Sequence, residues 1–370
     1  MPCDYYIIAG EASGDLHGAN LIHAIKAKQP NATFRLWGGE KMQKAAKSEL
    51  VVHYREMAFM GFIEVIKNIR TISRRLKQCK KDILEHNPQV LVLIDYPGFN
   101  MRIAKFAKEH GIKVAWYIAP QVWAWKENRV KALKRTTDLM LVILPFETDF
   151  FAKHDMDVTY VGHPLLDHLK WNPSAIDIED SPSIALLPGS RQQEINSILP
   201  RMLEVVKHFP KATFFISRAP SQSEAVYQPY LNDQVVLSEK NSYDLLAESD
   251  AALVTSGTAT LETALIGVPQ IVCYLTSPTT YQLAKFFIKV PFISLVNLIA
   301  DREVVKELIQ HNLNGDALKT ELAKILETEN RKDMLNDYKF IREKLGGHGA
   351  SERAADNIIA LHHNTRDSFL

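Results

Sequence analysis

Short β-branched or aromatic runs alternate with longer amphipathic stretches along most of the 370-residue chain, and this alternation constrains the fold more than any other feature. It is typical of parallel strands joined by crossover helices, which places the chain in the α/β class. Strands are predicted at residues 5–9, 33–37, 90–94, 113–117, 139–144 and 158–161, with helices such as 16–28 and 63–84 between them. The strand at 90–94 is apolar at every position, as expected where helices cover both faces of a sheet.

The pattern lapses between residues 164 and 182, where Trp171-Asn172-Pro173-Ser174 precedes an acidic run at 177–180. It restarts with predicted strands at 184–187, 213–217, 235–237, 251–255 and 270–274. We therefore expect two Rossmann-like, doubly wound domains, at 1–165 and 166–346, and a last helix within 347–370 that packs on either of them. Ligands bind outside the carboxyl ends of the strands in such sheets, so the functional loops are expected to face a central cleft.

The formal net charge of +1 averages over two unlike halves. Residues 1–170 carry 25 Lys and Arg against 18 Asp and Glu, whereas residues 171–370 carry 19 against 25. A composition that is 46% hydrophobic and 24% charged excludes a disordered chain, and the near-neutral total argues against a nucleic-acid partner. The basic half suits an anionic membrane surface or a phosphorylated lipid.

Several kinds of site have no support in the sequence. Cys3, Cys79 and Cys273 are isolated, so neither a disulfide framework nor a cysteine metal site is expected. The histidines lack partners at a recognised ligand spacing, so we predict no metal and no cofactor. The first residues do not resemble a signal peptide and no apolar run reaches roughly 18 residues, which predicts a cytoplasmic protein and leaves attachment to a membrane surface open.

Two loops of the first half are candidates for ligand binding and catalysis. Residues 10–15 follow the first predicted strand, and Glu11, Ser13 and Gly14 combine polar groups with the tight turn that glycine permits. The alternative is a plain structural turn in which Asp15 caps the helix. Asp95 follows the apolar strand at 90–94, where partial desolvation would raise its pKa and make it a competent general base, and Asn100 closes the same loop. A helix cap, or a partner for a nearby lysine, is the alternative role for Asp95.

Two loops of the second half suit a phosphorylated ligand. Gly189, Ser190 and Arg191 follow the strand at 184–187, where helix-start amides and a guanidinium could meet a diphosphate. Hydroxyl groups and amides gather again after the strand at 251–255, and an acid one turn later could accept ribose hydroxyls; these residues are Ser256, Gly257, Thr258 and Glu262. The alternative for the first loop is a surface arginine in the N-terminal turn of a helix. The alternative for the second loop is routine helix capping by serine and threonine.

Two basic stretches of the first half suggest a lipid surface. Residues 65–81 contain seven Lys or Arg and no acid, on a helical repeat with one apolar face, and an apolar segment precedes them. The second stretch, 126–135, follows three tryptophans and contains five basic residues. A core-packed helix with a solvated basic face is the alternative for the first stretch, and core tryptophans are the alternative for the second. The residues singled out for lipid contact are Met60, Phe62, Lys67, Arg70, Arg74 and Arg75.

A set of motifs, read in order, resembles the lipid-A-disaccharide synthases, a family of bacterial glycosyltransferases, over nearly the whole chain. The motifs are GEASGD (10–15), MGFIEV (60–65), IDYPGFN (94–100), VWAW (122–125), LPFE (144–147), VGHP (161–164), LLPGSR (186–191), SGTATLE (256–262) and SLVN (294–297). Each is short, but the ordered set is specific.

The resemblance implies a GT-B fold and an inverting transfer of diacylglucosamine from its UDP donor to 2,3-diacylglucosamine 1-phosphate, at the cytoplasmic face of the inner membrane. Asp95 matches the family's essential aspartate, Arg191 and Glu262 match donor-site residues, and Asn297 matches the asparagine of the SLPN motif. Val296 replaces the usual proline of that motif. The resemblance also leaves open a homodimer formed through the C-terminal region. Two alternatives to this transfer remain: another GT-B enzyme that acts on UDP-sugars, such as a 2-epimerase or a peptidoglycan glycosyltransferase, and a non-catalytic nucleotide-sugar or lipid-binding protein.

Overall fold

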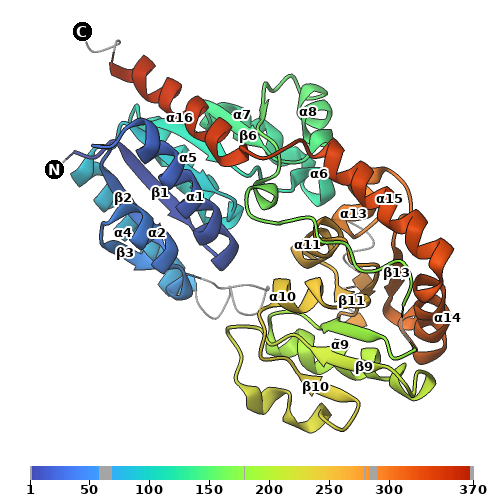
Figure 1. Cartoon of the computed structure of the whole chain (residues 1–370). Coiled ribbons are helices and arrows are strands. Elements are labelled where there is room, and N and C mark those ends of the chain that lie inside the picture. Colours follow the sequence, from blue (N-terminus) through green and yellow to red (C-terminus); the bar gives the residue numbers. More distant parts are fainter. Residues whose placement is uncertain (1, 58–68, 179, 279–280, 283–289, 367–370) are drawn as a thin grey trace. The chain divides into compact units, whose positions relative to one another are not determined.

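The computed structural model describes residues 2–57, 69–178, 180–278, 281–282 and 290–366 (Figure 1). It divides into two compact units, which are described separately. Unit 1 comprises Met1–Asp167 and Gly347–Leu370, and unit 2 comprises His168–Gly346. The last helix, for which the sequence left both domains open, therefore belongs to unit 1. Among the helices that the structure describes, none combines the length and the apolar character that crossing a bilayer requires.

Unit 1 is built on a parallel sheet of seven strands in the order β3-β2-β1-β4-β5-β6-β7. The chain order reverses between β1 and β4, which pair in register from Tyr5↔Val90 to Ala9↔Ile94. The strands are β1 (Tyr5–Ala9), β2 (Phe34–Gly38), β3 (Leu50–His53), β4 (Val90–Ile94), β5 (Lys113–Tyr117), β6 (Leu139–Val142) and β7 (Thr159–Tyr160).

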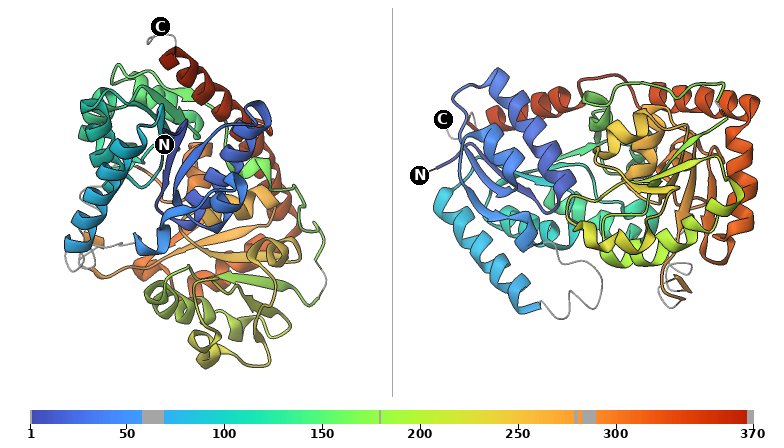
Figure 2. Two further views of the ribbon diagram at one scale, coloured as in Figure 1. Left: turned by 90° about the vertical axis from the view of Figure 1, so that its left-hand side faces the viewer. Right: turned by 60° about the horizontal axis from the view of Figure 1, so that its bottom comes forward.

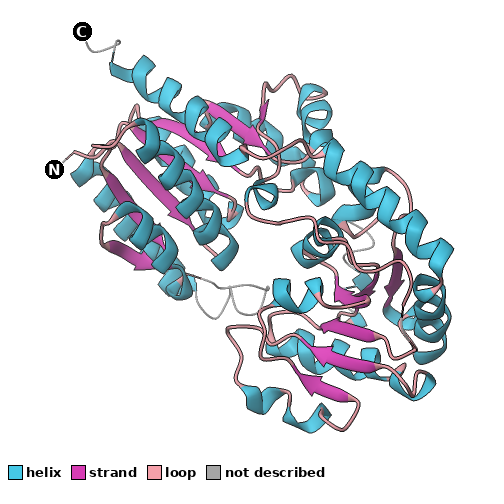
Figure 3. Cartoon of the chain, in the orientation of Figure 1, coloured by secondary structure: helices cyan, strands magenta, loops and turns pink. Residues whose placement is uncertain are grey.

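Helices lie on either side of this sheet (Figure 3). They are α1 (Ala12–Lys28), α2 (Glu40–Ala46), α4 (Ile69–His86), α5 (Pro97–Glu109), α6 (Val122–Trp125), α7 (Val130–Thr136), α8 (Pro145–Ala152) and α16 (Ala350–Arg366), with 3₁₀ turns η1 (Tyr54–Glu56), η2 (Glu127–Arg129) and η3 (Pro164–Asp167). Strands β1 and β4 are buried at every position, as the apolar runs predicted.

Unit 2 repeats the plan with six parallel strands in the order β10-β9-β8-β11-β12-β13. Its chain order reverses between β8 and β11, where Leu187 pairs with Val254. The strands are β8 (Ser183–Leu187), β9 (Thr213–Ile216), β10 (Val235–Leu237), β11 (Ala251–Thr255), β12 (Gln270–Tyr274) and β13 (Lys306–Ile309). The helices are α9 (Gln192–Leu203), α10 (Ser242–Ala247), α11 (Thr258–Ile266), α13 (Leu295–Ala300), α14 (Gly315–Leu326) and α15 (Thr328–Lys344), with 3₁₀ turns η4 (Val206–His208), η5 (Glu224–Val226), η6 (Gln228–Tyr230) and η7 (Gln310–Asn312).

The terminal helix α16 packs against α1 of unit 1 (Figures 1 and 2). Its N-terminus is capped by Asp167, whose carboxylate accepts hydrogen bonds from the amides of Gly349, Ala350 and Ser351 and from the Ser351 hydroxyl. Near its other end, the buried His362 lies 3.3 Å from Asp4, one residue before β1. The helix therefore contacts unit 1 both at Asp167, where its first segment ends, and at Asp4, just before β1.

Candidate active site

The carboxyl ends of β1 and β4 bring the first two predicted loops together at the point where the strand order reverses. Ala9 pairs with Ile94 at the ends of these strands; Asp95 directly follows Ile94, and Glu11 lies two residues after Ala9. In an open α/β sheet this is where a ligand crevice forms. The sequence-predicted candidates Glu11 and Asp95 are therefore neighbours in unit 1.

Asp95 is held in a conformation that few residues adopt. Its φ is 42° and that of Tyr96 is 49°, two consecutive non-glycine residues in the left-handed region. The buried Asn100 donates a hydrogen bond from Nδ2 to the Asp95 carbonyl oxygen (2.8 Å), and Tyr96 donates from its hydroxyl to Met57 (2.5 Å). A Cβ on Gly10 would lie 2.2 Å from the Tyr96 ring, so this turn requires glycine at position 10.

The Asp95 carboxyl has the electrostatics of a general base. Burial raises its pKa to about 7, with a further contribution from the negative charge of Glu11, while a backbone hydrogen bond at Tyr96 opposes the rise. A carboxylate with a pKa near the working pH is well matched to proton abstraction.

Glu147 adds a second buried carboxyl, which the sequence singled out only as part of a motif. It is 1% exposed, and it accepts hydrogen bonds from the Ile143 and Leu144 amides (3.1 and 2.9 Å) and from Trp123 Nε1 (3.1 Å). Burial raises its pKa to about 7; these hydrogen bonds oppose the rise, and the charge of Asp95 adds to it. The signal that the sequence offered was the place of Glu147 in the first turn of α8, soon after β6, since Asp95 likewise comes after a strand.

Ser13 and Gly14 occupy the first turn of α1. Ser13 is exposed, whereas Gly14 is buried with its Cα against Ala9 and Ile94, where an added Cβ would lie 3.1 Å from the Ala9 side chain. Gly14 thus allows α1 to approach the sheet. Asp15, for which a capping role was the alternative, accepts hydrogen bonds from the amides of Gly39, Lys41 and Met42 at the start of α2.

In unit 2, the other two predicted loops also follow neighbouring strands. Gly189, Ser190 and Arg191 leave β8, and Ser256, Gly257 and Thr258 leave β11, again where the strand order reverses. Gly189 (φ 108°) and Gly257 (φ 157°) both need the backbone freedom of glycine. The exposed Thr258 is the first residue of α11, and Ser256 donates its hydroxyl to the Ile293 carbonyl (3.1 Å).

The first of these loops contains an acid that sequence reasoning missed. Glu194, one turn into α9, accepts hydrogen bonds from the amides of Ser190 (3.2 Å) and Arg191 (3.3 Å) and from Arg191 Nη1 (2.8 Å). The amides predicted to meet an anion are therefore bonded to a carboxylate of the chain itself. A Cβ on Gly189 would lie 2.6 Å from Glu194 Oε2, so the glycine makes room for this acid.

Glu262 and Asn297 occupy different settings. Glu262 is half-buried, accepts a hydrogen bond from the Tyr243 hydroxyl (2.9 Å), and has its pKa raised by burial. Asn297 is fully buried; it donates to Val305 and Glu307, and its oxygen accepts from the amides of Val304 and Val305. These bonds use the full bonding capacity of the amide. Glu307, which accepts from Asn297, also accepts a hydrogen bond from the amide of Ile293 (3.0 Å), and Ser256 contacts the carbonyl of Ile293.

The first basic stretch forms α4, which packs on the core through Cys79 and Ile83. Arg70 and Arg74 are exposed, as is Ile69 (62%), but Arg75 is half-buried in an ion pair with Glu56. Met60, Phe62 and Lys67 lie outside the described residues. A shallow pocket beside α4 is lined by Met57, Ile72, Arg75, Tyr96 and Phe99, and Tyr96 connects it to the Asp95 turn.

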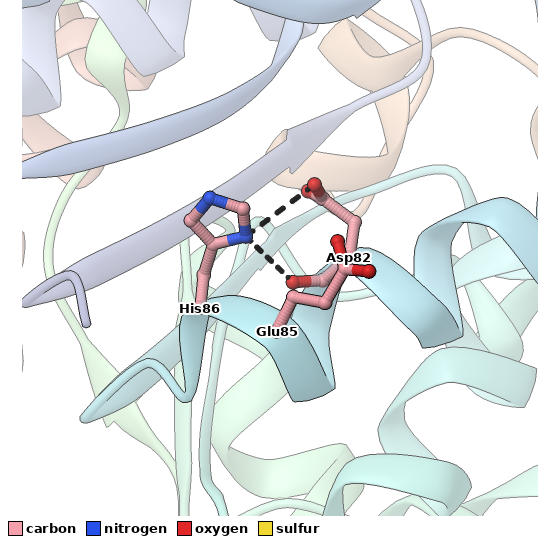
Figure 4. A group of neighbouring side chains, drawn as sticks. All are labelled: Asp82, Glu85 and His86. Atoms are coloured by element: carbon pink, nitrogen blue, oxygen red, sulfur yellow. Dashed lines mark hydrogen bonds and ion pairs between the residues drawn. The ribbon is translucent and has the colours of Figure 1, made fainter. Parts of the chain in front are cut away.

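One group of potential metal ligands occurs within the described ranges, and it lies on α4 away from the candidate loops. Asp82, Glu85 and His86 have ligand atoms within 4.8 Å of one another (Figure 4). Asp82 is already bonded to Arg35 (2.7 Å) and to the Tyr6 hydroxyl (2.6 Å), and these hydrogen bonds outweigh the effect of burial and lower its pKa. We therefore assign these three residues to the packing of α4 against the sheet and not to a metal site.

Comparison with known proteins decides the family. The profile of the lipid-A-disaccharide synthetase family matches residues 5–361. The chain belongs to this family. Among its relatives, the lipid-A-disaccharide synthase of Trichlorobacter lovleyi is 38% identical over 370 residues and that of Geobacter metallireducens is 39% identical over 373, each match covering 96% of both chains. Membership of the lipid-A-disaccharide synthetase family makes the chain a glycosyltransferase of lipid A biosynthesis.

Solved structures support the GT-B architecture predicted from the sequence. The chain aligns with the S. aureus MnaA–UDP co-structure at a TM-score of 0.68 and 13% identity, covering 99% of this chain and 98% of the other. It aligns with the glycotransferase of kitacinnamycin at a TM-score of 0.64 and 15% identity, covering 98% and 99%. At 13–15% identity, these likenesses concern the fold alone.

Proposed function

We propose that the chain transfers diacylglucosamine from UDP-2,3-diacylglucosamine to 2,3-diacylglucosamine 1-phosphate with inversion at the anomeric carbon. The observation that carries this proposal is Asp95, a carboxyl with a pKa of about 7 at the strand-order reversal of unit 1. Asp95 takes the proton of the acceptor's 6-hydroxyl as that oxygen bonds to the anomeric carbon. The bond from this carbon to the diphosphate breaks at the same time, and UDP leaves.

The donor's UDP binds unit 2. Support comes from the loops after β8 and β11, from the exposed start of α11, and from the structural neighbour S. aureus MnaA, which was solved as a co-structure with UDP. The leaving diphosphate gains negative charge, which Arg191 and the amides of the α11 N-terminus stabilise. Glu262 accepts the ribose hydroxyls, and its bond to Tyr243 fixes its carboxylate.

Asn297 and Glu194 support the residues of this donor site without binding the donor themselves. The saturated amide of Asn297 supports the segment that Ser256 contacts, and Glu194 occupies one guanidinium donor of Arg191 and fixes the direction of the side chain. Arginine has five N–H donors, so a phosphate can bind the same guanidinium. In unit 1, Glu11, Ser13 and Asn100 lie on the acceptor loops, with Asn100 holding the backbone of Asp95.

The acceptor lipid reaches unit 1 from an anionic membrane surface, the cytoplasmic face of the inner membrane. Support comes from the exposed cations Arg70 and Arg74 beside the exposed Ile69, and from the pocket that joins α4 to Tyr96. Basic residues beside apolar ones favour binding to anionic lipid. The proposal also includes a homodimer, in which two copies of this chain associate through the C-terminal region.

The test is UDP release from UDP-2,3-diacylglucosamine with and without the acceptor. We expect release only when 2,3-diacylglucosamine 1-phosphate is present, with one disaccharide formed for each UDP. A 2-epimerase would instead convert the UDP-sugar without an acceptor, and a binding protein would release no UDP. Either of these results, or release that is independent of the acceptor, contradicts the transferase proposal.

A further inference from the structure

Three cations of unit 1 lie on the connections that leave β4 and β5, the strands next to the proposed base. Arg102 is on α5, one turn beyond Gly98, to whose carbonyl its guanidinium donates a hydrogen bond. Lys126 and Arg129 belong to the segment that follows β5 and the short helix α6. Because β4 and β5 pair along their length, these connections start from one edge of the sheet, the edge from which Asp95 emerges.

Packing of their elements brings the three residues into one region of unit 1. The amide of Arg129 donates to the Lys126 carbonyl (2.9 Å) across the turn η2, and residues three apart in a 3₁₀ turn project on the same side. Helix α5 packs against α7, which begins directly after Arg129. The charges act on one another: beyond the effect of burial, Arg129 lowers the pKa of Lys126, and Arg102 lowers that of Arg129.

Within the described part of the chain, none of these three cations forms an ion pair, although acids are close in sequence. Glu127, between Lys126 and Arg129, faces His154 instead (3.1 Å). The nearby Lys108 and Lys113 both pair with Asp138. Lys126 and Arg129 are half-buried, and Arg102 is exposed. Like charges held close together cost free energy, and a bound anion lowers that cost.

We infer that Arg102, Lys126 and Arg129 bind the phosphate monoester of the acceptor sugar, which fixes the acceptor for attack beside Asp95. A monoester dianion matches a cluster of three cations, and a guanidinium fork pairs with phosphate oxygens through parallel hydrogen bonds. Lys126 lies over the ring of Trp125 (3.8 Å), which is 50% exposed and gives the site a flat apolar wall. This inference rests on the proposed function, because it assigns the phosphate of the acceptor named there.

The test uses the full-length chain in neutral detergent micelles and compares two acceptors, 2,3-diacylglucosamine with and without its 1-phosphate. We expect Arg129→Ala and Lys126→Ala to raise the KM for the phosphorylated acceptor by about 10- to 100-fold, the loss of one charge-assisted hydrogen bond. The KM for the UDP donor and the turnover of the unphosphorylated acceptor should stay at the wild-type level. Lys105→Ala, which removes a cation that pairs with Glu109 on the same helix as Arg102, is the matched control and should change neither acceptor's KM.

An anionic membrane lipid is the other source of a phosphate, so binding to vesicles of phosphatidylglycerol is measured in parallel. The inference is overturned if the variants lose vesicle binding but still prefer the phosphorylated acceptor as the wild type does. It is also overturned if Arg129→Ala and Arg129→Lys, each checked for an unchanged melting temperature, keep the wild-type KM for both acceptors. Failure of the wild type itself to form a disaccharide would instead contradict the proposed function.

Discussion

At the scale of single residues, three acids follow strands of unit 1, and the proposed chemistry is assigned to one of them, Asp95. Asp95, Glu11 and Glu147 follow β4, β1 and β6, and the fold holds two of them with a pKa of about 7. Glu147 is saturated by two amides and an indole, while Asp95 is held through its backbone. In the proposed transfer, the protonation state that matters is that of Asp95, whose pKa is raised by burial and by the charge of Glu11.

The pH profile tests this assignment. A base must be ionised, so kcat/KM should fall about tenfold per pH unit below a pKa of about 7 and level off above it. Removing the charge of Glu11 with Glu11→Gln should lower the pKa of Asp95 and move the acid limb to lower pH, because Glu11 contributes to the rise. A limb that stays in place in Glu11→Gln would contradict the electrostatic account of Asp95.

Replacement of Asp95 separates catalysis from binding. Asp95→Asn keeps the size of the side chain and removes the base, so turnover should fall by about 100- to 10,000-fold. UDP affinity, measured by calorimetric titration, should be unchanged because Asp95 belongs to unit 1. Turnover at the wild-type level would exclude Asp95 as the base.

Arg191 offers a matched comparison on one helix. It pairs with Glu194 at the start of α9 at 2.8 Å, and Arg201 pairs with Glu204 near the end of the same helix at the same distance and sequence spacing. Arg191→Ala should weaken UDP binding by about 1.5–3 kcal/mol, the value of a charge-assisted hydrogen bond. Arg201→Ala should leave UDP binding unchanged. Equal effects in the two variants would remove Arg191 from the donor site.

At the scale of elements, Asp167 caps the N-terminus of α16, the helix that packs on α1. Burial raises the pKa of Asp167, but the hydrogen bonds from Ser351 and the helix-start amides outweigh it and lower the pKa. A lowered pKa in the folded state means that the cap stabilises the fold above the unfolded pKa and that this stability is lost as the pH falls through the folded value.

Asp167→Ala should lower the free energy of unfolding by about 0.5–2 kcal/mol, as measured by urea denaturation at neutral pH. Asp356→Ala, which breaks the exposed ion pair between α16 and Lys28, should cost less than about 1 kcal/mol. The difference between the two variants should shrink in acid, where Asp167 is protonated. If Asp356→Ala were the more destabilising, surface charge rather than the cap would hold the helix.

Most strands, including the edge strands β7 and β10, could be predicted because they are short β-branched or apolar runs, but the edge strands β3 and β13 and some element ends could not. Strand β13 has one buried residue, Leu308, between charged and half-buried neighbours, and β3 likewise has only Val52 buried, so neither carries a clear periodic signal. The strand predicted at 139–144 ends at Val142, because the amides of Ile143 and Leu144 turn to Glu147 and Pro145 starts α8. Such ends are fixed by side-chain caps from residues further along the chain.

At the scale of the whole molecule, the chain forms two doubly wound units, the first of which also includes the C-terminal helix α16, and each unit brings two predicted loops together. That juxtaposition could be predicted because strand-to-helix loops meet where the strand order reverses. The hydrogen-bond and ion-pair partners of the side chains in these loops could not be predicted. Glu194 on the Arg191 amides, Glu56 on Arg75 and the saturated amide of Asn297 all depend on contacts that residue spacing does not specify.

The structure shows where the excess basic residues of the first half lie. The basic first half forms α4 and the Arg102, Lys126 and Arg129 cluster of unit 1, whereas the acidic second half forms the proposed UDP unit. Phosphorylated lipid is thereby assigned to one unit and nucleotide to the other.

The linkage of the product tests the central claim most directly. Purified chain is incubated with UDP-2,3-diacylglucosamine and 2,3-diacylglucosamine 1-phosphate, and the product is analysed by mass spectrometry and by NMR of its anomeric carbon. We expect one disaccharide 1-phosphate, joined at the acceptor's 6-oxygen, whose new linkage is inverted relative to the donor. A retained configuration, an epimerised UDP-sugar, or the absence of a disaccharide would contradict the proposed transfer.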